Sequence, residues 1–254
     1  METRARNMTD HAAAQDRSKD PQEGDPEPRE FLKYTFYKVR PEWRRLPTDV
    51  RKKQKAEFAS LLHDLEDEVT LRCYSLQGIR AYVDFMIWSI DPNIETFRDM
   101  ARQISSTDLG SYLDTTYAYL AASKRSQYIG GHVHAGQEGA TTRPAPVGSR
   151  FLFVYPFTKK REWYSIPFER RQEIMRDHIR IGHRYPSVRI HTAYSFGLDD
   201  QEFVLSFETD HPLDFLDLVM ELRSSEASKY TEKETPIFTC ILSEPESMLD
   251  ALGD

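Results

Sequence analysis

The chain has 254 residues, of which 39% are hydrophobic and 12% aromatic, and its formal net charge is −7 at pH 7. This composition supports a real core, in one large domain or two ordinary ones, and argues against a disordered protein. The negative balance is spread through the chain, which argues against a nucleic-acid-binding protein. No apolar run approaches the roughly 20 residues of a membrane helix.

The compartment follows from what the chain lacks. Its first 29 residues have no apolar centre of the kind found in secretory signals. Cys73 and Cys240 are its two cysteines, and they provide neither a disulfide framework nor a thiolate metal site. We therefore expect a cytoplasmic protein without a membrane span.

Residues 1–29 are polar and contain proline and glycine, so we expect a disordered tail there. Alternation from Phe31 predicts a strand, and Leu46-Pro47-Thr48 opens a helix with Thr48 as its cap. The buried stripe of this helix consists of Val50, Phe58, Leu61, Leu62 and Leu65. Strands at 70–76 and 82–90, a helix at 94–104 and a strand at 112–122 are expected next.

Residues 130–148 are rich in glycine and proline and predict a linker or a loop over a site. The order of elements then restarts. We expect a strand at 150–157, a helix at 167–183, strands at 188–196 and 202–209, a helix at 212–223, a strand near 236–242 and a terminal helix.

The two series are copies in one register. The stretch from Glu42 to Pro47, EWRRLP, recurs as EWYSIP from Glu162, an offset of 120 (162 minus 42). Tyr74-Ser75 returns at the same offset as Tyr194-Ser195. Each half reads β-α-β-β-α-β, the ferredoxin-like unit. The predicted fold class is α+β with duplicated ferredoxin-like units, whose sheets either face each other or curl into one barrel.

This reading gives four segments. Residues 1–29 form the tail, residues 30–128 a scaffold half, residues 129–149 the linker or active-site loop, and residues 150–254 the half that carries the site. The second half is assigned the site because it carries Tyr155, Lys159 and His178 where the first has Thr35, Val39 and Phe58.

His178 lies on the helix expected at residues 167–183. Helical spacing surrounds it with four apolar side chains, Phe168, Ile174, Met175 and Ile181. A lone histidine on such a stripe is more often a core residue than a ligand. However, the first copy has Phe58 at this place, so the fold does not require an imidazole there. A neutral imidazole in an apolar wall suits one axial bond to a haem iron, whereas zinc would need further ligands.

Strand alternation puts Tyr155, Phe157 and Lys159 on one face. Taken alone, they are typical of an amphipathic strand end with a solvated lysine. The alternative is a redox-active phenol beside a cation that receives a carboxylate.

Several other polar residues are candidates. His132 and His134 alternate in the glycine-rich stretch. This pattern is typical of a solvated loop, and it is a weak indication of a metal site. His191 stands where the first copy has Leu71, and it shares a strand face with Arg189. Arg143 and Arg150 flank the strand of Tyr155, and either could bind a carboxylate in the bidentate way of arginine, although surface arginine is the simpler interpretation.

The sequence resembles the chlorite dismutase superfamily over nearly all of residues 30–245. The resemblance is most specific at YPF from Tyr155, EWY from Glu162, MRDH from Met175, RYP from Arg184, GLDD from Gly197 and LRSSEAS from Leu222. The Tyr-Pro-Phe-x-Lys stretch is similar to that of the coproheme decarboxylases, peroxide-dependent haem synthases. The resemblance implies an α+β barrel of duplicated ferredoxin-like units, usually a homopentamer.

The resemblance also implies roles for individual residues. His178 would be the proximal iron ligand and Tyr155 the tyrosine whose radical attacks the propionates. Lys159 and Ser228 match propionate-binding positions, and Phe157 stands where some relatives have methionine. The upstream propionate arginine would be Arg143 or Arg150. Glu226 is a candidate to accept the second imidazole proton of His178.

The distal residue stays open at the sequence level. Ile190 or His191 falls at the position where chlorite-degrading relatives have arginine, and Arg189 only if the register slips. His191, His132 and His134 are the candidate bases for peroxide.

The leading hypothesis is decarboxylation of iron coproporphyrin III to haem b, with the iron porphyrin and hydrogen peroxide as the small-molecule partners. The alternatives are chlorite dismutation and a non-catalytic haem-binding or haem-trafficking protein.

Overall fold

The computed structural model describes residues 28–128 and 144–253. His132, His134 and Arg143, together with all of the expected tail except residues 28 and 29, lie outside this part of the chain.

The first half has six main elements in the predicted order. They are β1 (Phe31–Val39), α1 (Thr48–Glu68), β2 (Thr70–Ser75), β3 (Phe85–Asp91), α2 (Ile94–Ser106) and β4 (Leu113–Ala122), with short 3-10 turns at Trp43–Arg45 and Gly110–Tyr112. The expectation that Thr48 caps α1 is wrong. Thr48 is the first residue of the helix, Pro47 occupies the cap position, and no side chain caps this end.

The second half repeats this order with two additions. It comprises β5 (Phe151–Lys159), α3 (Glu162–Ser165), α4 (Phe168–Gly182), β6 (Arg189–Tyr194), β7 (Phe203–Thr209), α5 (Pro212–Arg223), a 3-10 turn at Glu226–Tyr230, β8 (Thr231–Lys233), β9 (Phe238–Leu242) and α6 (Pro245–Asp250). The short strand β8 was not expected from the sequence, because three polar residues carry no periodic signal.

The strands form one closed sheet. Their order is β7-β6-β4-β1-β3-β2-β9-β5, with β8 beyond β5, and an antiparallel pairing of β5 with β7 closes the ring. The first half contributes β4-β1-β3-β2 and the second β9-β5-β7-β6, so both halves have the same internal strand order. Short pairings of β4 with β6 and of β2 with β9 join them. The barrel alternative left open by the sequence is therefore the one that the structure adopts.

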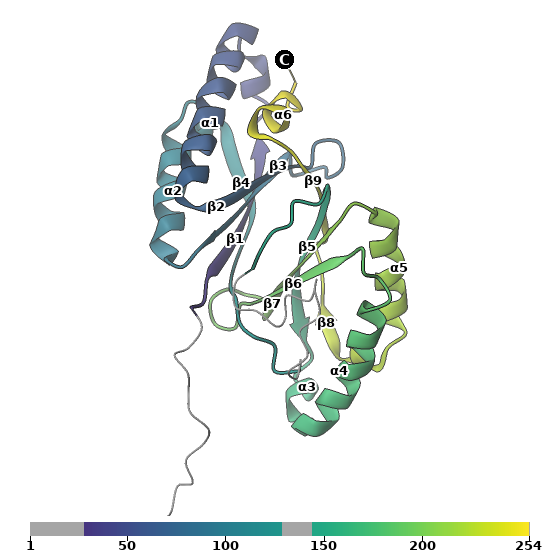
Figure 1. The fold of residues 1–254 in the computed structure, drawn as a ribbon. Coiled ribbons are helices and arrows are strands. Elements are labelled where there is room, and N and C mark those ends of the chain that lie inside the picture. Colours follow the sequence, from purple (N-terminus) through teal and green to yellow (C-terminus); the bar gives the residue numbers. More distant parts are fainter. Residues whose placement is uncertain (1–27, 129–143, 254) are drawn as a thin grey trace, which may run out of the picture.

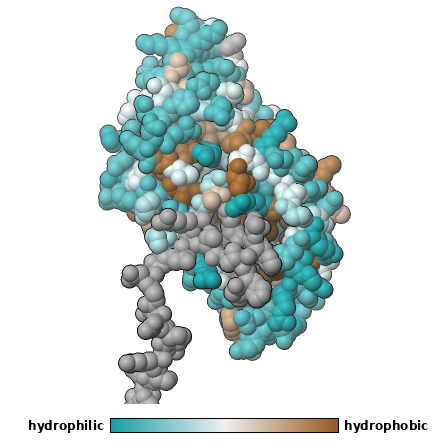
Figure 2. Space-filling model, viewed as in Figure 1, coloured by the Kyte–Doolittle hydropathy of each residue, from teal (hydrophilic) through white to brown (hydrophobic). Residues whose placement is uncertain are grey.

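Side chains fill the barrel and helices cover its outside. The interior cluster includes Tyr34, Phe36, Trp88 and Phe238, all no more than 1% exposed. In Figure 1, α1, α2 and α6 lie over the strands of the first half, and α4 and α5 lie over those of the second. The surface over the helices is largely hydrophilic in Figure 2, while apolar residues gather near the middle of this face.

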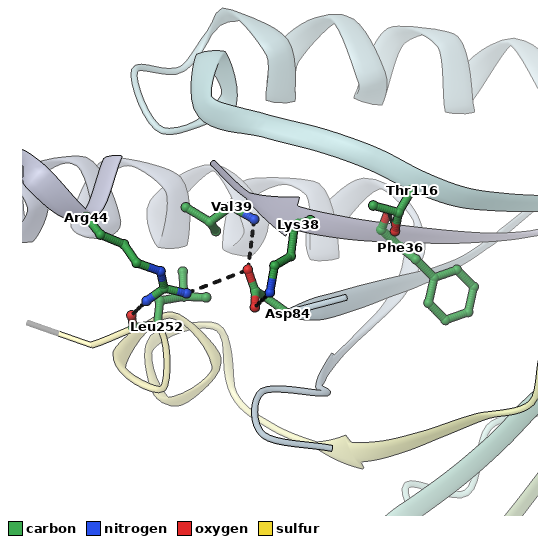
Figure 3. Close-up of polar contacts among 7 residues, drawn as sticks. All are labelled: Phe36, Lys38, Val39, Arg44, Asp84, Thr116 and Leu252. Carbon is green, nitrogen blue, oxygen red and sulfur yellow. Dashed lines mark hydrogen bonds and ion pairs between the residues drawn. The ribbon is translucent and has the colours of Figure 1, made fainter. Parts of the chain in front are cut away.

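A buried carboxylate ties the strand end of the first half to its neighbours. The side chain of Asp84 is 0% exposed and accepts hydrogen bonds from Lys38 Nζ at 2.7 Å and from Val39 N at 2.8 Å (Figure 3). Arg44 Nη2 lies 3.7 Å from its second oxygen, and Arg44 also donates to the Leu252 carbonyl. These bonds link β1, the turn before α1 and the segment after α6.

Candidate functional site

A cavity of about 1270 Å³ lies between the outer face of β5, β6 and β7 and the helices α4 and α5. This volume exceeds the roughly 300–1,000 Å³ typical of small-molecule sites, and it suits a large ligand. Its sheet wall is mainly apolar, with Ile190, Leu205 and Phe207 among the lining residues. The matching space of the first half is packed with core residues that include Trp43 and Phe58.

His178 lines this cavity from α4. Its Nδ1 is buried and has no hydrogen-bond partner among the described residues. Burial, and then the nearby positive charge of Lys159, lower the pKa of His178 to about 4. The imidazole is therefore neutral at pH 7, with a lone pair available for a metal.

Tyr155 and Phe157 line the same cavity from β5, as strand alternation predicts. Tyr155 is 6% exposed, and its ring stacks on Phe207 at 5.7 Å and 12°. Burial raises the pKa of Tyr155 above its usual range, and Glu234 adds to this effect. The phenol is thus protonated at pH 7 and stacked on the sheet wall opposite the helices.

Lys159 reaches the cavity at the end of β5. Its Nζ lies 4.7 Å above the ring of Trp163 and 5.1 Å above that of Phe157, and it donates to the Ala227 carbonyl at 3.4 Å. Burial lowers the pKa of Lys159 to about 8, although Glu202 and Glu234 oppose this fall. A largely buried ammonium in an apolar wall is suited to binding a carboxylate.

The expected propionate-binding residues divide between the cavity and the surface. Ser228 lines the cavity, but its hydroxyl donates to the carbonyls of Arg223 and Ser225 at 2.7 and 2.8 Å. Arg150 does not line the cavity, and its exposed side chain covers the ring of Phe151. The binding role expected for Arg150 therefore does not fit the geometry.

Charged residues that sequence reasoning missed also line the cavity. Arg223, at the end of α5, forms an ion pair with Glu234, which follows β8. Arg29, Lys124 and Arg125 lie along another part of the lining, at the start of β1 and after β4. No spacing rule connects these segments in sequence, because the barrel brings them together. The available signal would have been the β-α-β-β-α-β order predicted for each half, because β1 pairs with β4 in this unit.

His191 lies on the wrong side of the sheet for the expected distal base. Its ring faces the barrel interior, where Nε2 lies 2.7 Å from Glu208 Oε2 and the ring packs edge-on against Trp88. Its neighbours Ile190 and Thr192 line the cavity, whereas Arg189 and His191 do not. Alternation along β6 explains this, since one residue of register changes the face. A distal role for His191 or Arg189 does not fit this arrangement.

Glu226 is not the acceptor for His178. Its carboxylate binds Arg170 Nη2 through both oxygens, at 2.8 and 2.9 Å, on the protein surface. Among the described residues, the charged neighbour that acts on His178 is instead the cation Lys159.

Within residues 28–128 and 144–253, no helix is long and apolar enough to cross a membrane. The same segments contain no group of three or more His, Cys, Asp or Glu side chains that could hold a metal ion.

The fold and site define a closed α+β barrel with a large, partly cationic cavity and the neutral imidazole of His178 on its helical wall. The chlorite dismutase family model matches residues 51–243, and the chain belongs to this family. The chain is 32% identical over 189 residues to the coproheme decarboxylase of Mycolicibacterium smegmatis, which covers 72% of this chain and 78% of the relative.

Solved structures agree with the fold. Chlorite dismutase from Candidatus Nitrospira defluvii in complex with imidazole superposes with a TM-score of 0.78 at 22% identity, over 87% of this chain and 94% of the other. A mutant of the same protein gives 0.78 at 23% identity with the same coverage.

Proposed function

We propose that the protein is a coproheme decarboxylase, which converts iron coproporphyrin III to haem b with hydrogen peroxide. The observation that carries the proposal is the neutral imidazole of His178 in a cavity that also holds Tyr155 and Lys159. The 32% identity to a coproheme decarboxylase supports the same conclusion.

The residues present fit an iron porphyrin. The cavity of about 1270 Å³ has room for the macrocycle, and its apolar sheet wall suits a flat aromatic ligand. His178 offers one nitrogen, as axial haem ligation requires. Its Nδ1 is buried without a partner in the described part of the chain, which leaves Nε2 as the iron ligand. Lys159, Arg223 and the Arg29–Lys124–Arg125 edge supply cations for several carboxylates.

A bound iron porphyrin would supply the peroxide chemistry and the one-electron oxidations. Each propionate loses carbon dioxide, two electrons and a proton to become a vinyl group, and one hydrogen peroxide takes up the two electrons, that proton and a second proton from solvent and is reduced to two water molecules. Tyr155 would act as the hydrogen-abstracting group after losing an electron and its phenolic proton. Lys159 would hold the reacting propionate near this phenol, and the apolar walls would exclude water.

The described sheet wall opposite α4 does not present a histidine that could act as the peroxide base. The sheet wall opposite α4 presents Ile190 and Thr192, while His191 points away. His132 and His134, which lie outside the described residues, stay the candidates for the peroxide base. Replacing each by alanine should slow decarboxylation without changing porphyrin affinity.

The proposal is tested by reconstituting the protein with iron coproporphyrin III and adding peroxide in steps. The mass of the porphyrin is measured after each addition. We expect the loss of two carboxyl groups in wild type and none in Tyr155→Phe, which should still bind the porphyrin because its ring retains the stack on Phe207. Normal turnover by Tyr155→Phe would refute the radical role. A porphyrin that bleaches without losing a carboxyl group would refute the proposed function. Oxygen release from chlorite would then identify a chlorite dismutase.

The finer architecture is proposed as well. The shared strand order of the halves supports two ferredoxin-like copies, and the resemblance to the family supports a cytoplasmic homopentamer. Light scattering should then give about five times the chain mass of 29.7 kDa.

A further inference from the structure

Each half of the barrel has a carboxylate at the end of its first strand. Asp84 accepts a hydrogen bond from Val39 N at 2.8 Å, and Glu202 accepts one from Lys159 N at 2.8 Å. Val39 and Lys159 are related by the repeat offset of 120 (159 minus 39). Asp84 and Glu202 each directly precede the third strand of their half. The two carboxylates therefore occupy matching places in the fold.

The carboxylate of the first half is neutralised where it lies. Asp84 is fully buried, with Lys38 Nζ at 2.7 Å and Arg44 Nη2 at 3.7 Å (Figure 3). The offset of 120 puts Thr158 and Tyr164 at the places of these two cations.

Glu202 is instead held by a phenol. Tyr164 donates its hydroxyl hydrogen to Glu202 Oε2 at 2.6 Å, and this is the same oxygen that accepts from Lys159 N. Arg161 Nη1 lies 4.0 Å from the other oxygen, but its side chain is 90% exposed, so solvent screens its charge. The side chain of Glu202 itself is only 10% exposed. A nearly buried negative charge thus lies directly behind the cavity wall.

Lys159 is the cation at the end of β5, and its ammonium faces the cavity. Lys159 replaces Val39, and its backbone N–H binds Glu202 while its Nζ lies over Trp163 and lines the cavity. The same residue therefore connects Glu202 to the ligand space.

We propose that Glu202 is a positioning residue. It fixes the end of the strand at Lys159 and the ring of Tyr164, and it places its own negative charge behind the Lys159 ammonium. The ammonium stays available to a ligand carboxylate. The negative charges of Glu202 and Glu234 keep the pKa of Lys159 from falling further under its burial. Two ionisable groups of the facing helices line the cavity with Lys159: His178 on α4, which is neutral, and Arg223 on α5, which is paired with Glu234. The inference rests on the proposed function only for the identity of the ligand.

The first test needs no ligand. The ¹⁵Nζ resonance of Lys159, assigned by its loss in Lys159→Met, is titrated in the unliganded full chain. Glu202→Gln should lower the Lys159 pKa by about one unit or more, as expected for loss of an opposite charge near a buried group. Glu202→Asp, which reproduces the residue type of the first half, should restore most of it. Asp84→Asn is the matched control and should leave the titration unchanged. An unchanged Lys159 pKa in folded Glu202→Gln overturns the proposal.

A second measurement separates this proposal from the proposed function. Iron coproporphyrin III should bind Glu202→Gln about fivefold more weakly than wild type at pH 8, where a pKa lowered by one unit leaves about a fifth as much protonated Lys159, and almost equally at pH 6, where Lys159 is protonated in both. A shifted pKa with unchanged binding at pH 8 would leave the positioning of Lys159 intact and refute the proposed ligand contact.

A variant with the charge retained guards against a failure to fold. If Glu202→Gln does not fold, Glu202→Asp can be used instead, because its side chain is shorter by one methylene and moves the carboxylate away from Lys159 N. Amide exchange at Lys159 should then be at least about tenfold faster than in wild type, and unchanged exchange would overturn the proposal.

Discussion

Replacing His178 by phenylalanine should make the protein less sensitive to acid. Burial and the charge of Lys159 lower the pKa of His178 from 6.5 to about 4. The unfolded chain therefore binds a proton at this histidine below pH 6.5, whereas the folded chain does not. The stability that this histidine contributes is complete above pH 6.5 and is lost as the pH falls from 6.5 to 4. The shift of 2.5 units (6.5 minus 4) corresponds to about 3 kcal/mol at ~1.36 kcal/mol per unit.

Urea unfolding followed by circular dichroism at pH 7.5 and pH 4.0 measures this effect. The free energy of unfolding of wild type should fall by about 3 kcal/mol more than that of His178→Phe over this interval, because all other ionisable groups are shared. Phe58→His is the matched control. It puts an imidazole at the fully buried equivalent place of the first half and should increase acid sensitivity. Equal pH dependence of wild type and His178→Phe, within about 0.5 kcal/mol, would refute the buried neutral imidazole.

Three further substitutions probe the site. Lys159→Met should weaken coproporphyrin affinity about tenfold at pH 7, measured by Soret titration, and raise the pKa of His178, measured by NMR; an unchanged affinity would contradict its carboxylate role. His191→Gln should lower the melting temperature through its buried contact with Glu208, yet leave decarboxylation within about twofold of wild type; a hundredfold loss of rate would return His191 to the site. Arg223→Gln should weaken porphyrin affinity about threefold to tenfold, since its side chain is half exposed, and an affinity equal to wild type would remove it from the site.

The internal repeat in the sequence predicts most of the fold. Because the second series of elements follows the first at one offset, the strand order of one half predicts that of the other. The helices and strands begin within a few residues of their predicted positions, and α5 matches Pro212–Arg223 at both ends. What the repeat leaves open is how two four-stranded sheets meet. The joining pairs are few, Ala122 with Tyr194 and two between β2 and β9, and no local pattern marks them.

The lining of the cavity was predictable where one element carried several candidate residues. Tyr155, Phe157 and Lys159 alternate on β5, and all three line the cavity with His178. Prediction failed for His191, because alternation identifies two faces of a strand but not which face is the barrel interior.

The cavity cations were missed for a different reason. Arg29, Lys124 and Arg223 belong to segments remote in sequence, and only the closed sheet and its helices bring them to one space.

The C-terminal helix packs on the first half and not on the second, although both halves have the same strand order. Met248, Leu249 and Leu252, each 1% exposed, belong to the core cluster of the first half together with Trp43 and Phe58. In Figure 1, α6 lies beside α1 and away from α4 and α5.

The outer face of the first half is thus filled by large side chains from α1 and α6. In the second half, His178 replaces Phe58, and α6 is not available to fill the corresponding space. The first half is therefore packed with core side chains, including those of the C-terminal segment, while the second half leaves the cavity open to a ligand.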